Sequence, residues 1–164
     1  MPITAVLGTL LLVVVAAVLV SEAACAFQRQ HLRAKVYKRA KARSARTGKP
    51  LLVIGDPYNG YGSRFFGAAY GCGDVCSDLT GCPRCRRARK NALPHGLEDL
   101  PDDSHVVFIS YVLEYVDKYP ETVRELSRIG GKDVFLLRVQ PWCLTSLLYP
   151  GTKRVLYSDP FAKE

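Results

Sequence analysis

The chain has 164 residues, enough for one domain and a membrane anchor but too few for two full domains. Its net charge of +8 is concentrated in residues 28–49, which carry nine Lys and Arg side chains and no Asp or Glu. The rest of the chain has 14 basic and 15 acidic residues and is close to neutral. The high pI therefore does not indicate a nucleic-acid-binding domain, and no specific nucleic-acid partner is expected.

The N-terminal residues are almost uniformly apolar. Ile3 to Val20 form an 18-residue stretch whose only polar side chains are Thr4 and Thr9. A helix of this length spans about 27 Å, close to the hydrocarbon thickness of a bilayer. A cleavable signal peptide is the alternative, with small residues at 23–26, but the stretch lacks a basic n-region and is longer than the apolar core of such peptides. We predict a retained single-pass anchor in a lipid bilayer over residues 1–27.

The basic segment that follows predicts orientation and structure. Positive charges directly after the span favour keeping that side in the cytoplasm, so we expect the C-terminal domain on the cytoplasmic side. Residues 28–46 contain neither Gly nor Pro, which predicts that the helix continues out of the bilayer and ends at the T-G-K-P sequence of residues 47–50. This basic juxtamembrane helix of residues 28–49 either binds anionic headgroups or an acidic partner, or is a solvated spacer.

The remaining residues, 50–164, are predicted to form one α/β domain. Short apolar runs of the kind found in buried strands occur at 51–54, around 74–79, at 105–110 and at 133–139, with a short last strand at 154–157. Pro120 suits the first turn of a helix that Gly130 and Gly131 end, and a turn-rich loop occupies 55–62. Residues 81–94 show no clear period. This alternation predicts a parallel sheet, in which ligands bind beyond the carboxyl ends of the strands.

Two segments of this domain resemble a known family. L-E-D-L-P-D-D-S-H-V-V-F-I-S-Y-V-L-E-Y-V (97–116) and E-T-V-R-E-L-S-R-I-G-G-K-D-V-F-L-L-R-V (121–139) resemble the fourth strand, following helix and fifth strand of class I S-adenosylmethionine-dependent methyltransferases. L-L-V-I-G-D-P-Y-N-G-Y-G (51–62) lies where that family has its glycine-rich loop. The resemblance covers about residues 50–140 and implies an abbreviated Rossmann-like, methyltransferase-like sheet behind the N-terminal transmembrane helix.

The resemblance also implies a cofactor site for S-adenosylmethionine. Asp78 would accept hydrogen bonds from the ribose hydroxyls, and Asp99 would lie beside the adenine. The other implied positions are the loop residues Gly55, Asp56 and Gly60 near the methionine end, and Ser110 and Tyr111 at the end of the fourth strand. The sequence departs from the family pattern at Pro57 and Tyr58, which interrupt the loop, and it contains no evident general base. Methyl transfer can proceed by positioning alone, so an enzyme and an inactive fold both stay open.

The stretch from Gly55 to Cys85 is similar to short methyltransferase-like proteins of large DNA viruses of algae and protists, which have an internal membrane under the capsid. We therefore expect a membrane-anchored structural protein with a degenerate methyltransferase-like domain. It would link a membrane, such as the virion internal membrane, to other proteins of a large assembly, for example capsid proteins, as a minor capsid protein. The alternative is an active membrane-bound S-adenosylmethionine-dependent methyltransferase.

Four cysteines lie within 14 residues, as C-x3-C-x5-C-x2-C: Cys72, Cys76, Cys82 and Cys85. Four thiolates could form a tetrahedral zinc site, although the middle spacing is shorter than in zinc ribbons. Disulfides and free buried thiols are the alternatives, and a cytoplasmic domain argues against disulfides unless it matures in an oxidising virion. The sequence leaves all three open.

Overall fold

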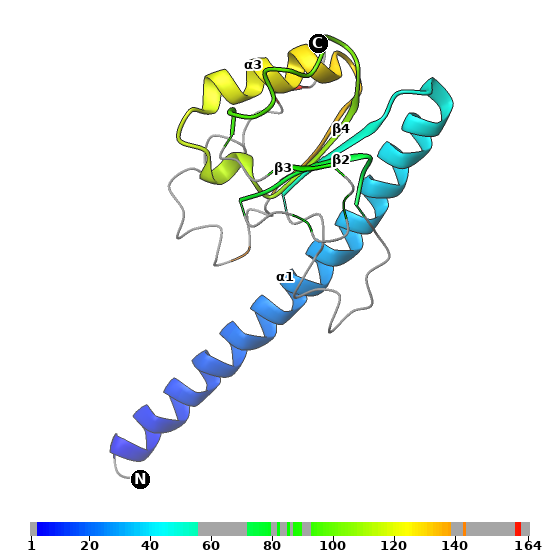
Figure 1. Cartoon of the computed structure of the whole chain (residues 1–164). Helices are drawn as coiled ribbons and strands as arrows, with labels where there is room; N and C mark the ends of the chain where they lie inside the picture. Colours follow the sequence, from blue (N-terminus) through cyan, green and yellow to red (C-terminus); the bar gives the residue numbers. More distant parts are fainter. Residues whose placement is uncertain are drawn as a thin grey trace.

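The computed structural model describes residues 3–55, 72–79, 82, 85, 87–89, 93–138, 143 and 160–161. It shows an α/β domain with one long apolar N-terminal helix (Figure 1). The elements in chain order are α1 (Ile3–Thr47), β1 (Leu51–Ile54), β2 (Val75–Ser77), β3 (Ala88–Arg89), β4 (Val106–Ser110), the 3-10 helix η1 (Leu113–Tyr115), α3 (Tyr119–Gly130) and β5 (Val134–Leu137).

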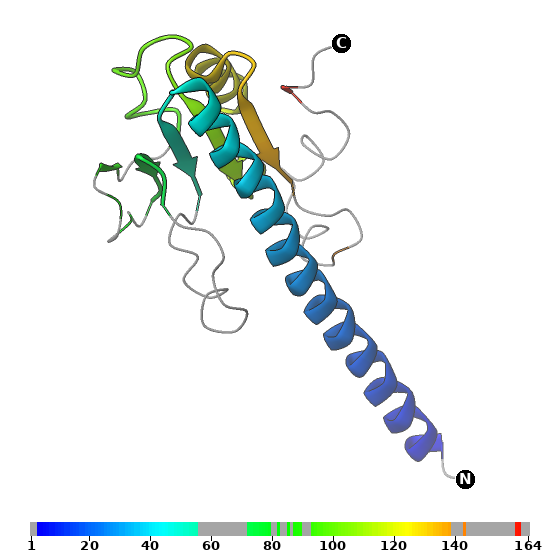
Figure 2. The same ribbon diagram turned by 90° about the vertical axis from the view of Figure 1, so that its right-hand side faces the viewer.

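The N-terminal half of α1 extends away from the domain (Figures 1 and 2). Its apolar side chains have no protein cover: Leu11 and Leu12 are 65% and 71% exposed, and only 6% of the most apolar 18-residue stretch is buried. On length and composition this helix can cross a membrane. The predicted continuation of the helix to Thr47 is confirmed.

The C-terminal half of α1 packs on the sheet. Tyr37 and Ala40, which share one face of the helix, are buried against Val53 of β1 and Phe108 of β4. The Tyr37 and Phe108 rings meet edge to face, with their centroids 5.6 Å apart. The segment expected as a juxtamembrane helix therefore supplies one layer of the domain core, and it is not a solvated spacer along its whole length.

Three basic side chains of this segment have partners among the described residues of the domain. The Arg33 guanidinium is buried, and its Nη2 donates a hydrogen bond to the Gly55 carbonyl oxygen at 2.9 Å. Arg43 Nε lies 2.7 Å from Asp133 Oδ1, and Lys49 Nζ lies 3.6 Å from Asp133 Oδ2. Because Asp133 is only 4% exposed, its charge needs these partners. The ion pairs join the end of α1 to the start of β5.

All five strands are parallel, in the order β3-β2-β1-β4-β5. Alternation of side chains separates two cores: Leu52 and Ile54 pack with Leu126 and Ile129 of α3, whereas Leu51 and Val53 face α1. Helices therefore cover both faces, as a buried parallel sheet requires (Figure 2).

The observed elements confirm the predicted α/β class and the strands at 51–54, within 74–79, and within 105–110 and 133–139. The helix that begins next to Pro120 and ends at Gly130 is also confirmed. β3 was not predicted, because a two-residue edge strand carries no periodic signal. The strand expected at 154–157 lies outside the described residues.

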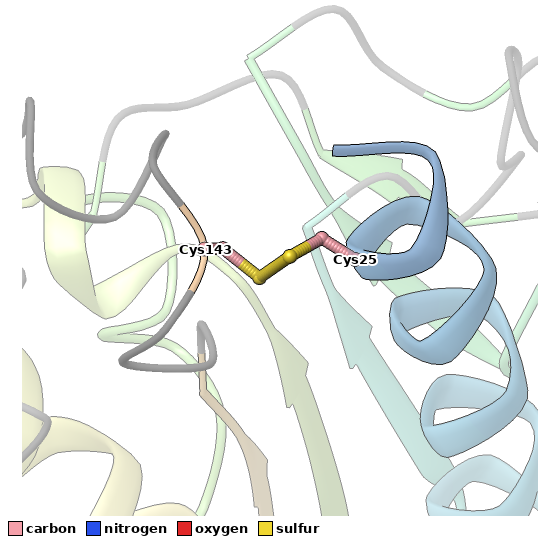
Figure 3. The surroundings of a disulfide bond; sticks show 2 residues. All are labelled: Cys25 and Cys143. Atoms are coloured by element: carbon pink, nitrogen blue, oxygen red, sulfur yellow. A yellow bond between two sulfur atoms is a disulfide. The ribbon is translucent and has the colours of Figure 1, made fainter. Parts of the chain in front are cut away.

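A disulfide joins Cys25 of α1 to Cys143, which follows β5 in the chain (Figure 3). Both cysteines are fully buried, with Cα atoms 5.9 Å apart. This pair was not predicted: its members are 118 residues apart, and the spacing of the cysteines indicated disulfides only among the four that are clustered. The bond ties the C-terminal part of the chain to the helix just beyond its apolar stretch.

We predict that Tyr37→Ala lowers the free energy of unfolding by about 3 kcal/mol, because it removes a buried ring from the interface between α1 and the sheet. Lys38→Ala, on the exposed side of the same turn, should change it by less than about 0.5 kcal/mol. Urea unfolding of the full chain in detergent, followed by the fluorescence of its single tryptophan, measures both. Equal midpoints for the two variants would contradict the packing of α1 on the sheet.

Candidate functional site

A cavity of about 450 Å³ opens at the carboxyl ends of β1, β2 and β4. This volume falls within the range of about 300–1,000 Å³ typical of small-molecule sites. Most of its wall is apolar or aromatic, from Ile54, Leu79, Leu93, Tyr111, Val112, Tyr115 and Val116, and its polar lining residues are Ser77, Asp78, His95, Asp117 and Lys118. Such a wall suits a flat, partly apolar ligand that a few polar groups orient.

The end of β2 supplies two polar side chains of the cavity wall, Ser77 and Asp78. Ser77 is 1% exposed, and its Oγ has no hydrogen-bond partner among the described residues. Asp78 follows it and is half-buried, held by a backbone hydrogen bond from its N–H to the Arg89 carbonyl oxygen at 3.1 Å. A buried hydroxyl without a partner is costly in a finished protein core. Here it lies where a bound ligand could satisfy it.

Tyr111 forms part of the cavity wall directly after β4. Its backbone is left-handed, with φ of 53°, a conformation that a bulky residue keeps only when its surroundings hold it. Its hydroxyl donates to the Arg29 carbonyl oxygen of α1 at 3.3 Å. The long helix therefore positions one wall of the cavity.

Gly55 lines the cavity at the end of β1, and the structure gives a steric reason for glycine there. Its φ is +81°, and an added Cβ would collide with the Val112 side chain and the Ser110 carbonyl oxygen. Close packing of β1 against the turn after β4 thus requires glycine at this position, whether or not a ligand is bound.

The expected cofactor residues are brought together only in part. Gly55, Asp78 and Tyr111 line the cavity, and Ser110 is buried at the end of β4 beside them. Asp99 is not among the described lining residues: it is exposed and accepts a hydrogen bond from Arg89 Nη2 at 2.7 Å, and bonding from Arg89 lowers the pKa of its carboxyl. Asp56 and Gly60 lie outside the described residues.

Several lining residues were missed by the sequence reasoning. Ser77 lies inside the strand predicted around residues 74–79 and is the last residue of the observed β2, whereas the resemblance singled out its neighbour Asp78. Tyr115 and Val116 come from η1 and the residue after it, a turn that follows β4 and folds back over the cavity edge. Only the position after a strand could have indicated them, because ligand-contacting residues in parallel sheets gather there.

The four clustered cysteines form a second site on the other face of β2. The sulfur atoms of Cys72, Cys76 and Cys82 all lie within 4.8 Å of one another, and Cys72 Sγ is 2.8 Å from Cys82 Sγ. Cys76 and Cys85 both donate to the Gly73 carbonyl oxygen, at 3.9 and 3.5 Å. Burial, followed by the hydrogen bond with Cys82, raises the pKa of the Cys72 thiol to about 11. Burial also raises the pKa of Cys76.

Comparison of the chain with protein-family models, curated proteins and solved structures finds no match. Function is therefore argued from the two sites themselves.

Two of the glycines with positive φ, at 48 and 55, provide a matched test of the cavity geometry. Gly48 has φ of +70° with nothing within 4 Å of an added Cβ, so Gly48→Ala should cost only the backbone term of about 1 kcal/mol. Gly55→Ala adds steric overlap and should lower the free energy of unfolding by about 3 kcal/mol. Urea unfolding of both variants measures the difference. An equal loss would mean that β1 and the turn after β4 do not pack as described.

Proposed function

We propose that this protein is a membrane-anchored α/β domain that binds S-adenosylmethionine, or a closely related adenosyl compound, in the cavity at the ends of β1, β2 and β4. The observation that carries the proposal is the half-buried Asp78 carboxylate at the end of β2, beside an unpartnered Ser77 hydroxyl and a wall of aromatic and aliphatic side chains. A carboxylate with two acceptor oxygens suits vicinal hydroxyls, and the apolar wall suits a purine ring.

The strand order supports a Rossmann-like assignment for the sheet. The order 3-2-1-4-5 reverses its direction between β1 and β4, and ligands of such sheets bind outside the carboxyl ends of the strands at this switch point. The cavity touches the residues that end β1 and β2 and those that follow β4. The resemblance of residues 97–139 to methyltransferases favours S-adenosylmethionine among the ligands that such a cavity could take.

The chain's own residues would bind and orient this ligand. Asp78 and Ser77 would accept or donate hydrogen bonds at the sugar, and Tyr111 and Tyr115 would exclude water from the apolar side. S-adenosylmethionine supplies an activated methyl group when bound, and transfer needs an acceptor held in line with it. His95 and Asp117, which also line the cavity, could accept a proton from a methyl acceptor. Ligand binding is the function that we propose, and methyl transfer is its extension.

The tethering role expected from the sequence is the second candidate, and the form of α1 favours it. One uninterrupted helix of 45 residues is exposed at its apolar end and packed on the sheet at the other. Such a helix would hold the domain at a fixed distance and angle from a bilayer. The proposed partners are proteins of a larger assembly, such as a capsid, and this choice rests on the sequence resemblance alone.

Two features of the chain favour opposite orientations of the domain relative to the membrane. The basic residues after the apolar stretch favour a cytoplasmic domain. The Cys25–Cys143 disulfide is of a kind that is rare in the reducing cytosol. We propose that the domain lies on the cytoplasmic side and that this disulfide forms once the protein enters an oxidising particle, such as a virion with an internal membrane.

Calorimetric titration of S-adenosylmethionine into the full chain in detergent tests the binding proposal. We expect micromolar affinity, and at least a tenfold loss in Asp78→Asn, because the amide removes one acceptor and the charge. The control is Glu121→Gln, which makes the same charge change at an exposed position outside the cavity lining. Failure of the folded chain to bind would overturn the cofactor proposal, and equal affinity of both variants would overturn the role of Asp78.

Carbonate extraction of membranes tests the anchor. The full chain should stay in the pellet, and a chain that starts at Ser21 should be released, because it lacks the apolar stretch but keeps Cys25 and the packed half of α1. A shortened chain that still sediments would identify the basic helix or a partner as the tether.

Protease added to sealed cells tests the orientation. The domain should stay intact if it is cytoplasmic. Degradation of the domain would mean that the orientation is the reverse of the one proposed.

A further inference from the structure

We propose that the four cysteines bind one zinc ion, which fastens the edge of the sheet that holds β2 and β3 beneath α1. This site is separate from the cavity and does not rest on the proposed cofactor. None of the described residues that line the cavity is a cysteine.

The convergence of the sulfur atoms is the first argument. In a tetrahedral site with Zn–S bonds of about 2.3 Å, the sulfur atoms lie about 3.8 Å apart. Cys72, Cys76 and Cys82 already have their sulfurs within 4.8 Å of one another. Cys85 donates to the same Gly73 carbonyl oxygen as Cys76, so the fourth thiol lies near Cys76, at the edge of this group of three. Small side-chain rotations would place four sulfurs around one ion.

The choice of donors is the second argument. Four thiolates without a carboxylate or an imidazole favour zinc in a closed structural site over magnesium or calcium. Zinc with four thiolates carries a net charge of −2, and Arg84, Arg86 and Arg87 lie within two residues of Cys85 in the sequence. These three guanidinium groups would balance this charge.

The composition of the β2–β3 connection is the third argument. Between Ser77 and Ala88 the sequence contains only one large aliphatic side chain, Leu79, and that side chain is 67% exposed. Burial of apolar surface therefore contributes little to fixing this segment on the domain. The pairing of β3 with β2 also contributes little, because β3 has only two residues. A metal ion replaces a hydrophobic core in such segments.

The site also has a fixed support. Cys76 belongs to β2, and its side chain is buried in the same core as Tyr37 and Phe108. The Tyr37 hydroxyl donates to the Cys72 carbonyl oxygen at 3.2 Å. Zinc bound here would therefore join α1, the start of β2 and the connection to β3.

The competing arrangement is a disulfide between Cys72 and Cys82, whose sulfurs lie 2.8 Å apart. That pairing would leave two buried thiols next to it, open to exchange with the disulfide. Zinc uses all four thiols and would protect them in a chain that carries a disulfide elsewhere, between Cys25 and Cys143.

Metal analysis of the full chain, purified in detergent without added chelator, tests the proposal. We expect about one zinc per chain by mass spectrometry of the metal. Cobalt exchanged into the site should give the thiolate-to-metal charge-transfer absorption of a tetrahedral sulfur site. Cys82→Ser should lose most of the zinc, whereas Cys143→Ser, which removes a cysteine outside the cluster, should keep it.

A measurement on the wild-type chain tests the proposal even where the Cys82→Ser variant does not fold. Titration of the wild-type chain with a mercurial reagent should release zinc in step with modification of four thiols. A metal-free chain that contains a Cys72–Cys82 disulfide by peptide mapping would overturn the proposal. So would four thiols that alkylate fully in the native chain without zinc release, or full zinc retention by a folded Cys82→Ser variant.

Discussion

The packing of the C-terminal half of α1 on the sheet is the contact on which the rest of the structure depends. Parallel strands made of apolar residues must be covered on both faces, and α3 covers only one of them. Tyr37 and Ala40 close the other face, and Arg43 and Lys49 supply the charges that the buried Asp133 requires. The same helix carries the exposed apolar stretch. A domain attached in this way cannot swing freely on a flexible linker, because its connection to the apolar stretch is part of its own core.

The short strand β2 positions both sites through the alternation of its side chains. Val75 packs in the core on the α3 side, Cys76 faces α1, and Ser77 ends the strand at the cavity. The proposed zinc site and the proposed ligand site thus lie on opposite faces of one three-residue segment. Anything that loosens the cysteine cluster should also move Ser77 and Asp78, so zinc would support the ligand cavity without taking part in it.

The long helix also reaches the cavity. Arg33 holds the carbonyl of Gly55, and the carbonyl of Arg29 accepts the Tyr111 hydroxyl. Two residues of the cavity wall are therefore fixed by the turns of α1 just beyond its apolar stretch, near the Cys25–Cys143 disulfide. In the proposed tether, the distance between the cavity and the bilayer surface would be short and fixed, which would restrict acceptors or partners to molecules at that surface.

The sequence by itself determined the apolar stretch, the end of α1 before Gly48 and the buried strands around Val53 and Phe108, because these depend on local composition and turn residues. The family resemblance placed Asp78 near the end of the second strand, the end at which ligands of parallel sheets bind. Only the tertiary structure decided the strand order, the two-residue β3 and the steric need for glycine at 55. It likewise paired Cys25 with Cys143, and it turned the face of α1 around Tyr37 into a core layer. These features arise from contacts between residues far apart in the chain. A pattern read along one segment contains no information about which distant segment will cover it.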